Sequence, residues 1–340
     1  MATEGMITFR DFMEAALYDP EGGYYACGGA IGEGGDFVTS PALSPLFARA
    51  VARVFARDAP VFEGEMVFCE AAAGAGGFLR DFREALEEMD PDVSRRTRLR
   101  AIERSAAGRA RIEAGGLSER ITADVSEWEG ERFEGWVFSN ELYDALPVHR
   151  VVRTEGRLFE LGVCLSESGD AFEWTARPAP PELAAYLGRF QIDLAEAQVA
   201  EINLAAAPLH RSLCRLVSRG RAVAFDYGHR ASVLYHPHAR PRGTLAVHAR
   251  GRRGADPLAR PGQVDLTAHV NWDDLEAAGE AEGFSTDARI RQSRFLLEAG
   301  LFEDAGERRL DALRLFDPEG IGDALSVLLQ SKGLGKPPFR

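Results

Sequence analysis

Apolar residues return every three or four positions in two segments near the start of the chain. Residues 7–19 and residues 43–57 both show this spacing, which predicts two amphipathic helices. Asp19-Pro20 ends the first helix, and a glycine-rich stretch separates it from the second. We expect residues 1–60 to form a helical cap for the core that follows.

Short apolar runs then alternate with helical patterns. Strands are predicted at residues 66–70, 98–103, 121–124 and 136–139, and helices at residues 77–89 and 105–114. A strand–helix–strand series of this kind argues for a parallel sheet that binds its ligand at the carboxyl ends of the strands. Residues 61–164 are therefore expected to form an α/β, Rossmann-like core.

The second half of the chain resumes this alternation after an insertion. Two apolar runs at residues 148–152 and 158–164 predict a hairpin. A proline-containing loop with a short helix is expected at residues 165–193, and a long helix at residues 194–218. Later elements are strands at residues 221–226, 243–247, 284–291 and 325–331, a loop at residues 228–242, and helices at residues 271–282 and 293–300. Residues 165–218 would thus be inserted, and residues 219–340 would complete the core sheet and the acceptor-side loops.

Composition and charge narrow the classes of function. The chain has 340 residues, a net charge of −13 and 45% hydrophobic residues. This negative balance argues against binding nucleic acid or docking on anionic membranes, because both need a basic surface. No apolar stretch approaches the roughly 20 residues of a membrane span. The four cysteines lie far apart and the N-terminus does not resemble a secretory signal, so we expect a cytoplasmic protein with reduced thiols.

The segment after the first predicted strand carries the strongest chemical signal. It is a small-residue turn between a strand and a helix, and reads Glu70-Ala71-Ala72-Ala73-Gly74-Ala75-Gly76-Gly77. Such turns let backbone N–H groups approach a ligand at a helix N-terminus. The dinucleotide pattern G-x-G-x-x-G would need a glycine where Leu79 stands, which disfavours a hydride-transferring dehydrogenase.

The order of acidic and small residues in this turn resembles instead the E-x-G-x-G-x-G turn of class I S-adenosylmethionine methyltransferases. The corresponding positions are Glu70, Ala72, Gly74 and Gly76. Ala72 stands where that pattern has its first glycine. At a negative φ the extra methyl group costs little, whereas at a positive φ it strains the turn by roughly 1 kcal/mol or more.

Two further carboxylates follow neighbouring strands. Glu103 comes one strand–helix–strand step after Glu70 and can accept hydrogen bonds from both hydroxyls of an adenosine ribose. Asp124 follows the third strand and is placed to accept from an adenine amino group. The alternatives stay open, because acids at strand ends and in loops also occur without a ligand.

A second strong signal lies just past the fourth strand, in Asn140-Glu141-Leu142-Tyr143-Asp144-Ala145-Leu146-Pro147-Val148-His149. Asn140 offers an amide oxygen to an amine or a guanidinium, and Glu141 and Asp144 can pair with a cation or take a proton. Methyl transfer from a sulfonium needs little beyond alignment, and two carboxylates fit an arginine side chain. The structural alternative is that Asn140 and Asp144 cap a short helix beginning at Glu141.

Metal chemistry is not expected from the histidines. His236-Pro237-His238 has no third ligand at a suitable spacing, so we interpret it as part of a surface loop. The chain also contains neither a G-x-S-x-G elbow nor a G-x-x-x-x-G-K-[ST] phosphate loop.

Taken together, these motifs resemble the MidA-like methyltransferase family, whose mitochondrial members are complex I assembly factors that methylate arginine. The most specific match is the segment Asn140–His149, and further matches begin at Phe12, Gly35, Asp226, Gly243, Asp265 and Phe295, so the resemblance covers nearly the whole chain. It implies a Rossmann-like class I methyltransferase sheet with an N-terminal helical cap and an inserted substrate-facing segment.

The resemblance also implies roles for individual residues. Cofactor binding would fall to Glu70, Ala72, Gly74, Gly76, Glu103 and Asp124, with Gly35, Thr39 and Ser40 closing that site. Asn140, Glu141 and Asp144 would orient the acceptor, with Glu141 holding or deprotonating it. Pro147, His149, Asp226, Tyr227 and His269 would line the acceptor side.

We therefore predict an enzyme that uses S-adenosyl-L-methionine, releases S-adenosyl-L-homocysteine and methylates arginine on a protein partner. Homodimer formation is left open. Two other functions also stay open. The alanine-rich turn would suit a catalytically silent assembly protein that keeps the fold, and the large insertion could cover a small-molecule acceptor as well as a protein.

Overall fold

The computed structural model describes residues 5–26, 39–249, 252–253 and 256–335. It divides into two compact units, each built from separate stretches of the chain. Unit 1 contains Met1–Ala30, Tyr143–Ala206 and Gly228–Asp274, and unit 2 contains Ile31–Leu142, Ala207–Tyr227 and Leu275–Arg340. The segment expected to form one N-terminal cap is therefore shared, because α1 (Phe9–Tyr18) lies in unit 1 and α3 (Pro45–Asp58) lies in unit 2.

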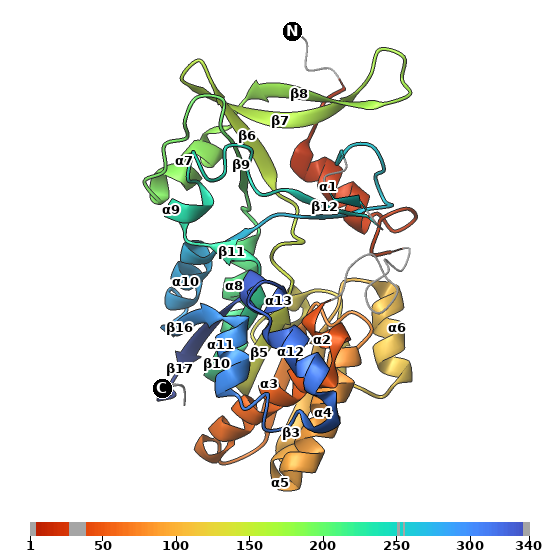
Figure 1. Cartoon of the computed structure of the whole chain (residues 1–340), viewed down its shortest axis with the longest axis vertical. Helices are drawn as coiled ribbons and strands as arrows, with labels where there is room; N and C mark the ends of the chain where they lie inside the picture. The colour runs from red at the N-terminus through yellow and green to blue at the C-terminus, as the bar shows by residue number, and fades with distance from the viewer. Residues whose placement is uncertain (1–4, 27–38, 250–251, 254–255, 336–340) are drawn as a thin grey trace. The chain divides into compact units, whose positions relative to one another are not determined.

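Unit 2 is built on a seven-stranded sheet with the order β16-β17-β10-β5-β2-β3-β4 (Figure 1). Its strands are β2 (Met66–Ala71), β3 (Thr97–Ile102), β4 (Arg120–Thr122), β5 (Phe133–Asn140), β10 (Val217–Asp226), β16 (Ser285–Arg291) and β17 (Ser326–Lys332). The strands from β10 to β4 are parallel, whereas β17 runs antiparallel between β10 and β16. This sheet confirms the predicted α/β, Rossmann-like class, and it brings the carboxyl ends of β2, β3 and β5 to one edge.

Helices alternate with these strands in the predicted order. Those of unit 2 are α2 (Ser40–Leu43), α3, α4 (Gly77–Met89), α5 (Pro91–Arg96), α6 (Ala106–Ala114), α11 (Gln292–Glu298), α12 (Arg309–Phe316) and α13 (Ile321–Ala324), with 3-10 turns η1 (Ala59–Val61), η2 (Val125–Trp128) and η3 (Gly306–Arg308). Two further helices, α8 (Ala206–Arg215) and α10 (Trp272–Glu280), include residues of both units.

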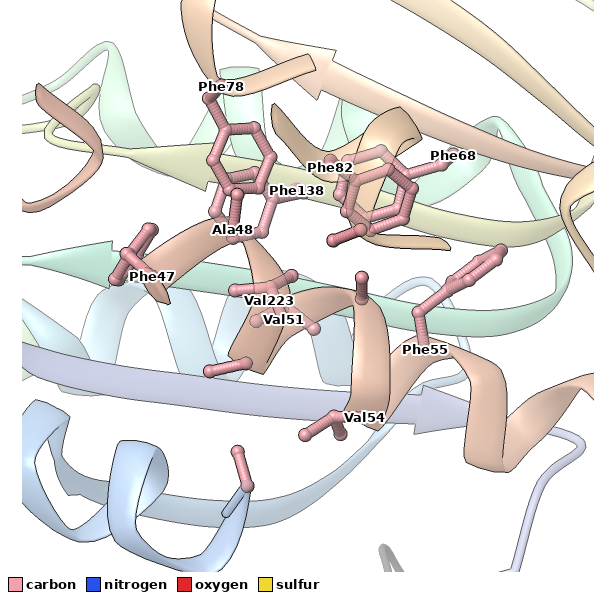
Figure 2. Close-up of a cluster of buried hydrophobic side chains, with 14 of the residues drawn as sticks. Phe47, Ala48, Val51, Val54, Phe55, Phe68, Phe78, Phe82, Phe138 and Val223 are labelled. Atoms are coloured by element: carbon pink, nitrogen blue, oxygen red, sulfur yellow. The ribbon is translucent and has the colours of Figure 1, made fainter. Parts of the chain in front are cut away.

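One face of α3 supplies much of the unit 2 core. Phe47, Val51 and Phe55 are completely buried in the same cluster as Phe68 of β2 and Phe138 of β5 (Figure 2). The rings of Phe55 and Phe68 meet edge to face, with centroids 5.5 Å apart. Each fully buried phenylalanine contributes about 1.5–3 kcal/mol to folding, so this face fixes α3 against the sheet.

A buried ionic network lies at the end of α3. The guanidinium of Arg221, a residue only 1% exposed, donates to both carboxylate oxygens of Asp58, at 2.6 and 2.9 Å. It also donates to Asp287 at 2.7 Å, while Trp136 Nε1 donates to Asp58 at 2.9 Å. The network therefore connects α3 to β10 and β16 through charged side chains that are almost completely buried, and to β5 through the indole N–H of Trp136.

The main sheet of unit 1 contains β1 (Ile7–Thr8), β6 (His149–Thr154), β7 (Arg157–Leu165), β8 (Phe172–Pro178) and β9 (Val199–Ile202). β6 and β7 form the predicted antiparallel hairpin. α1 begins at the cap residue Thr8, whose hydroxyl accepts from the Asp11 N–H, and it buries Phe9, Met13 and Leu17 in the core of this unit.

Two predictions for the inserted region are wrong. Residues 194–218 do not form one helix, because β9, α8 and the start of β10 occupy them. β9 owes its conformation to pairing with β6, and Asn203 Oδ1 then accepts from Ala205 and Ala206 N–H to begin α8. Residues 165–193 contain the expected short helix, α7 (Pro181–Arg189), but also β8, which pairs with β7.

The rest of unit 1 consists of short elements. They are β11 (Gly228–His229), α9 (Ala231–Leu234), β12 (Ala246–Ala249), β13 (Arg252–Arg253), β14 (Asp265–Thr267) and β15 (Val270–Asn271). The strand predicted at residues 243–247 thus begins at Ala246. Among the described helices of the chain, none combines the length and the apolar character of a membrane span.

We expect Arg221→Met to lower the free energy of unfolding by about 3–5 kcal/mol, because it leaves Asp58 and Asp287 buried without their counter-charge. Chemical denaturation measures this loss. Arg215→Met is the matched control, since Arg215 pairs with Glu282 at the surface, where its side chain is 54% exposed. That change should cost less than about 1 kcal/mol. Equal losses of unfolding free energy in the two variants would show that the buried network contributes no more to stability than a surface ion pair.

Candidate functional site

The turn after β2 is held by the neighbouring strand. Ala72 and Ala73 both donate their backbone N–H to the carbonyl oxygen of Ile102, at the end of β3, at 2.8 and 3.3 Å. Gly76, which has no side chain to cap a helix, precedes α4. The first N–H groups of this 13-residue helix, and with them its partial positive charge, are therefore directed at the turn.

Three residues of the turn have a left-handed backbone. The angle φ is +61° at Ala72, +55° at Gly74 and +77° at Gly76. Glycine adopts this conformation freely, whereas alanine loses about 1–2 kcal/mol in it. The backbone thus keeps the shape of a glycine turn at all three positions, and Ala72 carries strain.

Glu103 holds this turn from the end of β3. Its Oε2 accepts from the Gly74 N–H at 2.7 Å, and its Oε1 accepts from the Ser105 N–H at 2.6 Å. Burial raises the pKa of Glu103, and the hydrogen bonds from Ser105 and Gly74 oppose that rise. The structure therefore places Glu103 at the turn, where it fixes the backbone; its predicted contact with a ribose stays a prediction.

Gly108, in α6, contributes to the site and was missed in the sequence. An ideal Cβ on Gly108 would lie 2.5 Å from the carbonyl oxygen of Gly74 and 2.8 Å from Cγ of Glu103. Only glycine lets α6 approach the turn so closely. A glycine within a helical pattern was the available signal, although it does not reveal what the helix approaches.

Glu70 is a buried acid near the end of β2. Its side-chain atom Oε2 has no hydrogen-bond partner among the described residues, and the residue is 4% exposed. Burial raises the pKa of Glu70 well above 4.5, and the negative charge of Glu103 raises it further. A donor or a cation supplied by a ligand would stabilise the carboxylate form of this group.

The end of β5 presents a second unpaired oxygen. Asn140 Nδ2 donates to Glu141 Oε1 at 2.9 Å, while Asn140 Oδ1 is buried with no hydrogen-bond partner in the described part of the chain. Because β5 and β2 are parallel neighbours, Asn140 and Glu70 lie at the same edge of the sheet. This edge therefore offers two acceptors in need of donors.

Glu141 leaves β5 in a strained conformation. Its φ is +51°, and its N–H donates to the carbonyl oxygen of Phe225 in β10 at 2.8 Å. Left-handed residues other than glycine gather at functional sites, where neighbouring structure holds them. Residues 141–148 form an irregular loop with a turn at Asp144-Ala145 and no helix, so the alternative in which Asn140 and Asp144 cap a helix is not what the structure has.

The other predicted cofactor residues have local structural partners. Asp124 is exposed and caps η2, with Oδ1 accepting from the Ser126 N–H at 2.8 Å; hydrogen bonding to Ser126 lowers its pKa. Thr39 precedes α2, and Ser40 is buried and donates to Gln292 Oε1 at 2.9 Å. Gly35 lies outside the described residues. The cofactor roles of these residues stay predictions.

The residues predicted for the acceptor side are divided between the two units. Asp226 and Tyr227 lie in unit 2, whereas Asp144, Pro147, His149 and His269 lie in unit 1. Asp226 is fully buried and accepts from the Tyr227 N–H at 2.8 Å. In unit 1, the carbonyl oxygen of Asp144 accepts from the Ala268 N–H at 2.9 Å, which joins the Asp144 loop to the residue before His269.

His149 takes part in a polar network of the unit 1 sheet. Its Nδ1 lies 2.6 Å from Oε1 of Glu160, which is fully buried, and Arg177 donates to the other oxygen of Glu160 at 2.7 and 2.9 Å. This network gives His149 a structural function, and its acceptor role stays a prediction.

Burial lowers the pKa of His269 to about 4, and Arg240 adds to that effect.

Glu201 connects two of the segments that carry the family resemblance. Its Oε2 accepts from the Thr244 N–H at 2.6 Å and would lie 2.2 Å from an ideal Cβ on Gly243, where φ is +76°. Thr244 Oγ1 in turn accepts from the His269 N–H at 3.1 Å. The glycine at 243 is therefore required by a buried carboxylate that the sequence analysis did not single out.

With this geometry established, comparison with known proteins identifies the family. A family model described as "Putative S-adenosyl-L-methionine-dependent methyltransferase" matches residues 46–289. The chain belongs to this methyltransferase family. A crystal structure from Burkholderia thailandensis, solved with S-adenosyl-homocysteine bound, is similar with a TM-score of 0.85 and 34% identity, over 98% of this chain and 89% of that one.

Curated relatives agree with this methyltransferase assignment. The protein arginine methyltransferase NDUFAF7, mitochondrial, of Mus musculus is 23% identical over 336 residues, which cover 87% of this chain and 71% of that protein. Its homolog in Drosophila melanogaster is 25% identical over 313 residues, covering 82% and 68%. The predictions of a MidA-like, S-adenosylmethionine-dependent methyltransferase and of its class I fold are confirmed.

The residues at the sheet edge fit this cofactor. S-adenosyl-L-methionine carries an ammonium group and ribose hydroxyls, which donate hydrogen bonds, and the unpaired oxygen of Glu70 suits such a donor. Apart from their chain neighbours, no described atom lies within 4 Å of an ideal Cβ on Gly74 or Gly77, so the turn is open beside these two glycines, whereas a Cβ on Gly76 would lie 2.7 Å from Leu117 Cδ1. Among the described residues no group of His, Cys, Asp and Glu side chains could hold a metal ion.

Ala72→Gly should raise the free energy of unfolding by about 0.5–1 kcal/mol, because the loss of left-handed strain exceeds the entropy that glycine gains in the unfolded chain. Chemical denaturation of the purified protein measures the change. Ala73→Gly is the control, since Ala73 is not among the residues with a positive φ and glycine there should only destabilise. A less stable Ala72→Gly variant would show that the turn is not strained.

Proposed function

We propose that this methyltransferase transfers a methyl group to an arginine side chain of a protein partner. The observation that carries the proposal is the amide oxygen of Asn140, buried and unpaired beside the carboxylate of Glu141. A guanidinium has several N–H donors and a positive charge, and it pairs with both groups. The names of the curated relatives, protein arginine methyltransferases, support the same acceptor.

The cofactor supplies an electrophilic methyl group on a positively charged sulfur. The residues of the chain bind the cofactor and the acceptor and align them for transfer of this methyl group. Glu70 accepts from the cationic end of the cofactor, Glu103 accepts from the ribose hydroxyls, and Asp124 accepts from the adenine amino group. Thr39 and Ser40 close this side of the site together with Gly35.

Asn140 and Glu141 act on the acceptor. Asn140 Oδ1 accepts from one guanidinium nitrogen and fixes its direction, and Glu141 holds the cation and takes the proton that the methylated nitrogen loses. Roles in acceptor binding stay predictions for Asp226 and Tyr227 of unit 2 and for Asp144, Pro147, His149 and His269 of unit 1. The strained φ of Glu141 fixes the direction of its side chain before the acceptor arrives.

The partner and the compartment are also proposals. A net charge of −13 favours a protein acceptor over nucleic acid. We also propose that the chain forms a homodimer. Reduced, widely spaced cysteines favour a cytoplasmic location, while the curated relatives are named as mitochondrial proteins.

Binding of S-adenosyl-L-homocysteine should release protons and become tighter as the pH rises. In the free protein the raised pKa keeps Glu70 protonated to a higher pH than its ordinary 4.5, whereas the ligand ammonium binds best to the carboxylate. Binding therefore expels a proton at pH values between the pKa of Glu70 in the complex and its raised pKa in the free protein, and above the raised pKa none is expelled. Calorimetric titrations in two buffers of different ionisation enthalpy measure this release.

Glu70→Gln is the control for this measurement, because the amide does not titrate. Its affinity should lose the pH slope that Glu70 causes in the wild type. A wild-type affinity that is independent of pH, with no proton release, would contradict the protonated state of Glu70.

Glu141→Gln should reduce methyl transfer at least about a hundredfold and leave affinity for S-adenosyl-L-methionine near that of the wild type, because the amide neither takes a proton nor holds a cation. Transfer is followed with labelled cofactor, and affinity by calorimetry. Glu103→Ala is the opposite control, since it should lose cofactor binding. Unchanged turnover in Glu141→Gln would remove this residue from the mechanism.

The acceptor is tested by incubating the enzyme with methyl-labelled cofactor and a lysate, with Glu141→Gln in parallel. Label recovered as methylarginine after acid hydrolysis of the protein fraction supports the proposal. Label recovered in small molecules would instead show that the chain is a small-molecule methyltransferase. Failure of the wild type to bind the cofactor at all would identify a protein that keeps the fold without the reaction.

A further inference from the structure

β8 is an edge strand of the unit 1 sheet. It pairs with β7 from Phe159↔Pro178 to Leu165↔Phe172, and no other strand of the described chain pairs with it (Figure 1). Its aromatic residues Phe172 and Trp174 remain 39% and 37% exposed. An exposed edge with apolar side chains is a template for a further strand.

The hydrogen bonds at the two ends of the β7–β8 pair show which residues of β8 face outward. Ser166 N–H donates to the carbonyl oxygen of Ala171 at 2.8 Å, and Ala179 N–H donates to that of Leu158 at 3.0 Å. Bonded pairs recur at every second residue of an antiparallel ladder, so the odd-numbered residues of β8 bond to β7. The backbone groups of Phe172, Trp174 and Ala176 therefore point away from the sheet.

We infer that β8 pairs antiparallel with β8 of a second copy of this chain, about a twofold axis at Thr175. In this register Trp174 exchanges backbone hydrogen bonds with Ala176 of the partner subunit. Phe172 lies opposite Pro178 of the partner subunit, which has no N–H and so ends the ladder. The two unit 1 sheets become one continuous sheet, and each covers the open edge of the other.

The side chains of β8 are complementary to themselves in this register. Glu173 lies opposite Arg177 of the partner subunit, so that opposite charges meet on one face. In each chain Nε and Nη2 of Arg177 donate to Glu160, so the pair across the axis uses Nη1 of this side chain, which is 42% exposed. On the other face, where the Trp174 and Phe9 ring centroids are 5.1 Å apart, the bulky Trp174 meets the small Ala176 of the partner subunit. An axis at residue 173 or 177 would instead set like charges against each other, and an axis at 174 or 176 would leave the charges unmatched.

Disulfide formation tests the register. Residues of a non-hydrogen-bonded antiparallel pair have Cα atoms about 4.5 Å apart, which a disulfide spans. Thr175→Cys should therefore give a covalent dimer on mild oxidation with copper–phenanthroline. Glu173→Cys is the matched control, because its counterpart lies about 13 Å along the strand. Both variants carry Cys164→Ser, since Cys164 is a half-exposed thiol on the adjacent strand.

Sedimentation of the full chain tests the dimer itself. Wild-type protein should sediment with the mass of two chains, and Glu173→Arg, which sets arginine against arginine twice, should raise the dimer dissociation constant at least about tenfold. Binding of S-adenosyl-L-homocysteine by Glu173→Arg should be unchanged and shows that the variant is folded. A monomeric wild type, or equal cross-linking at positions 173 and 175, would overturn the inference.

Discussion

The Glu103 carboxylate is the contact on which the cofactor edge of unit 2 depends. It bonds to the Gly74 turn and to the start of α6, so one buried acid sets the position of two loops at the ends of neighbouring strands. Because those loops are fixed, the turn tolerates a left-handed alanine. Burial, and with it the charge of Glu103, makes ionisation of Glu70 unfavourable, so the carboxylate form of Glu70 depends on a cationic ligand.

The elements that could be predicted are those whose pattern is local. The period of apolar residues located α3, α4 and the parallel strands within a few residues, because an amphipathic helix or a buried strand shows its period in its own sequence. β8 and β9 were missed since each exists through pairing with another strand. The compact units were missed for a related reason, as contacts between distant segments define them.

The features of the site likewise divide into those that the sequence could predict and those that it could not. Parallel strands end at one edge, so the sequence could place Glu70, Glu103 and Asn140 together before any coordinates were known. It could not give the sign of φ at Ala72, which is set by the bonds from the turn to Ile102. It also gave no role to Gly108, because the space beside that residue is occupied by another part of the chain. The backbone conformation of Ala72 and the close approach of α6 to the turn both depend on segments that meet only in the folded sheet.

The place of β17 in the sheet has a consequence for biosynthesis. This strand follows both β10 and β16 in chain order, yet it lies between them in the sheet. Until Ser326–Lys332 have left the ribosome, β10 presents an edge of unpaired backbone groups, and its apolar residues Val223 and Phe225, both buried in the folded protein, lie in that strand. Exposed strand edges promote aggregation of incomplete chains. The interval between synthesis of β10 and synthesis of β17 is therefore the stage at which this chain most needs a chaperone.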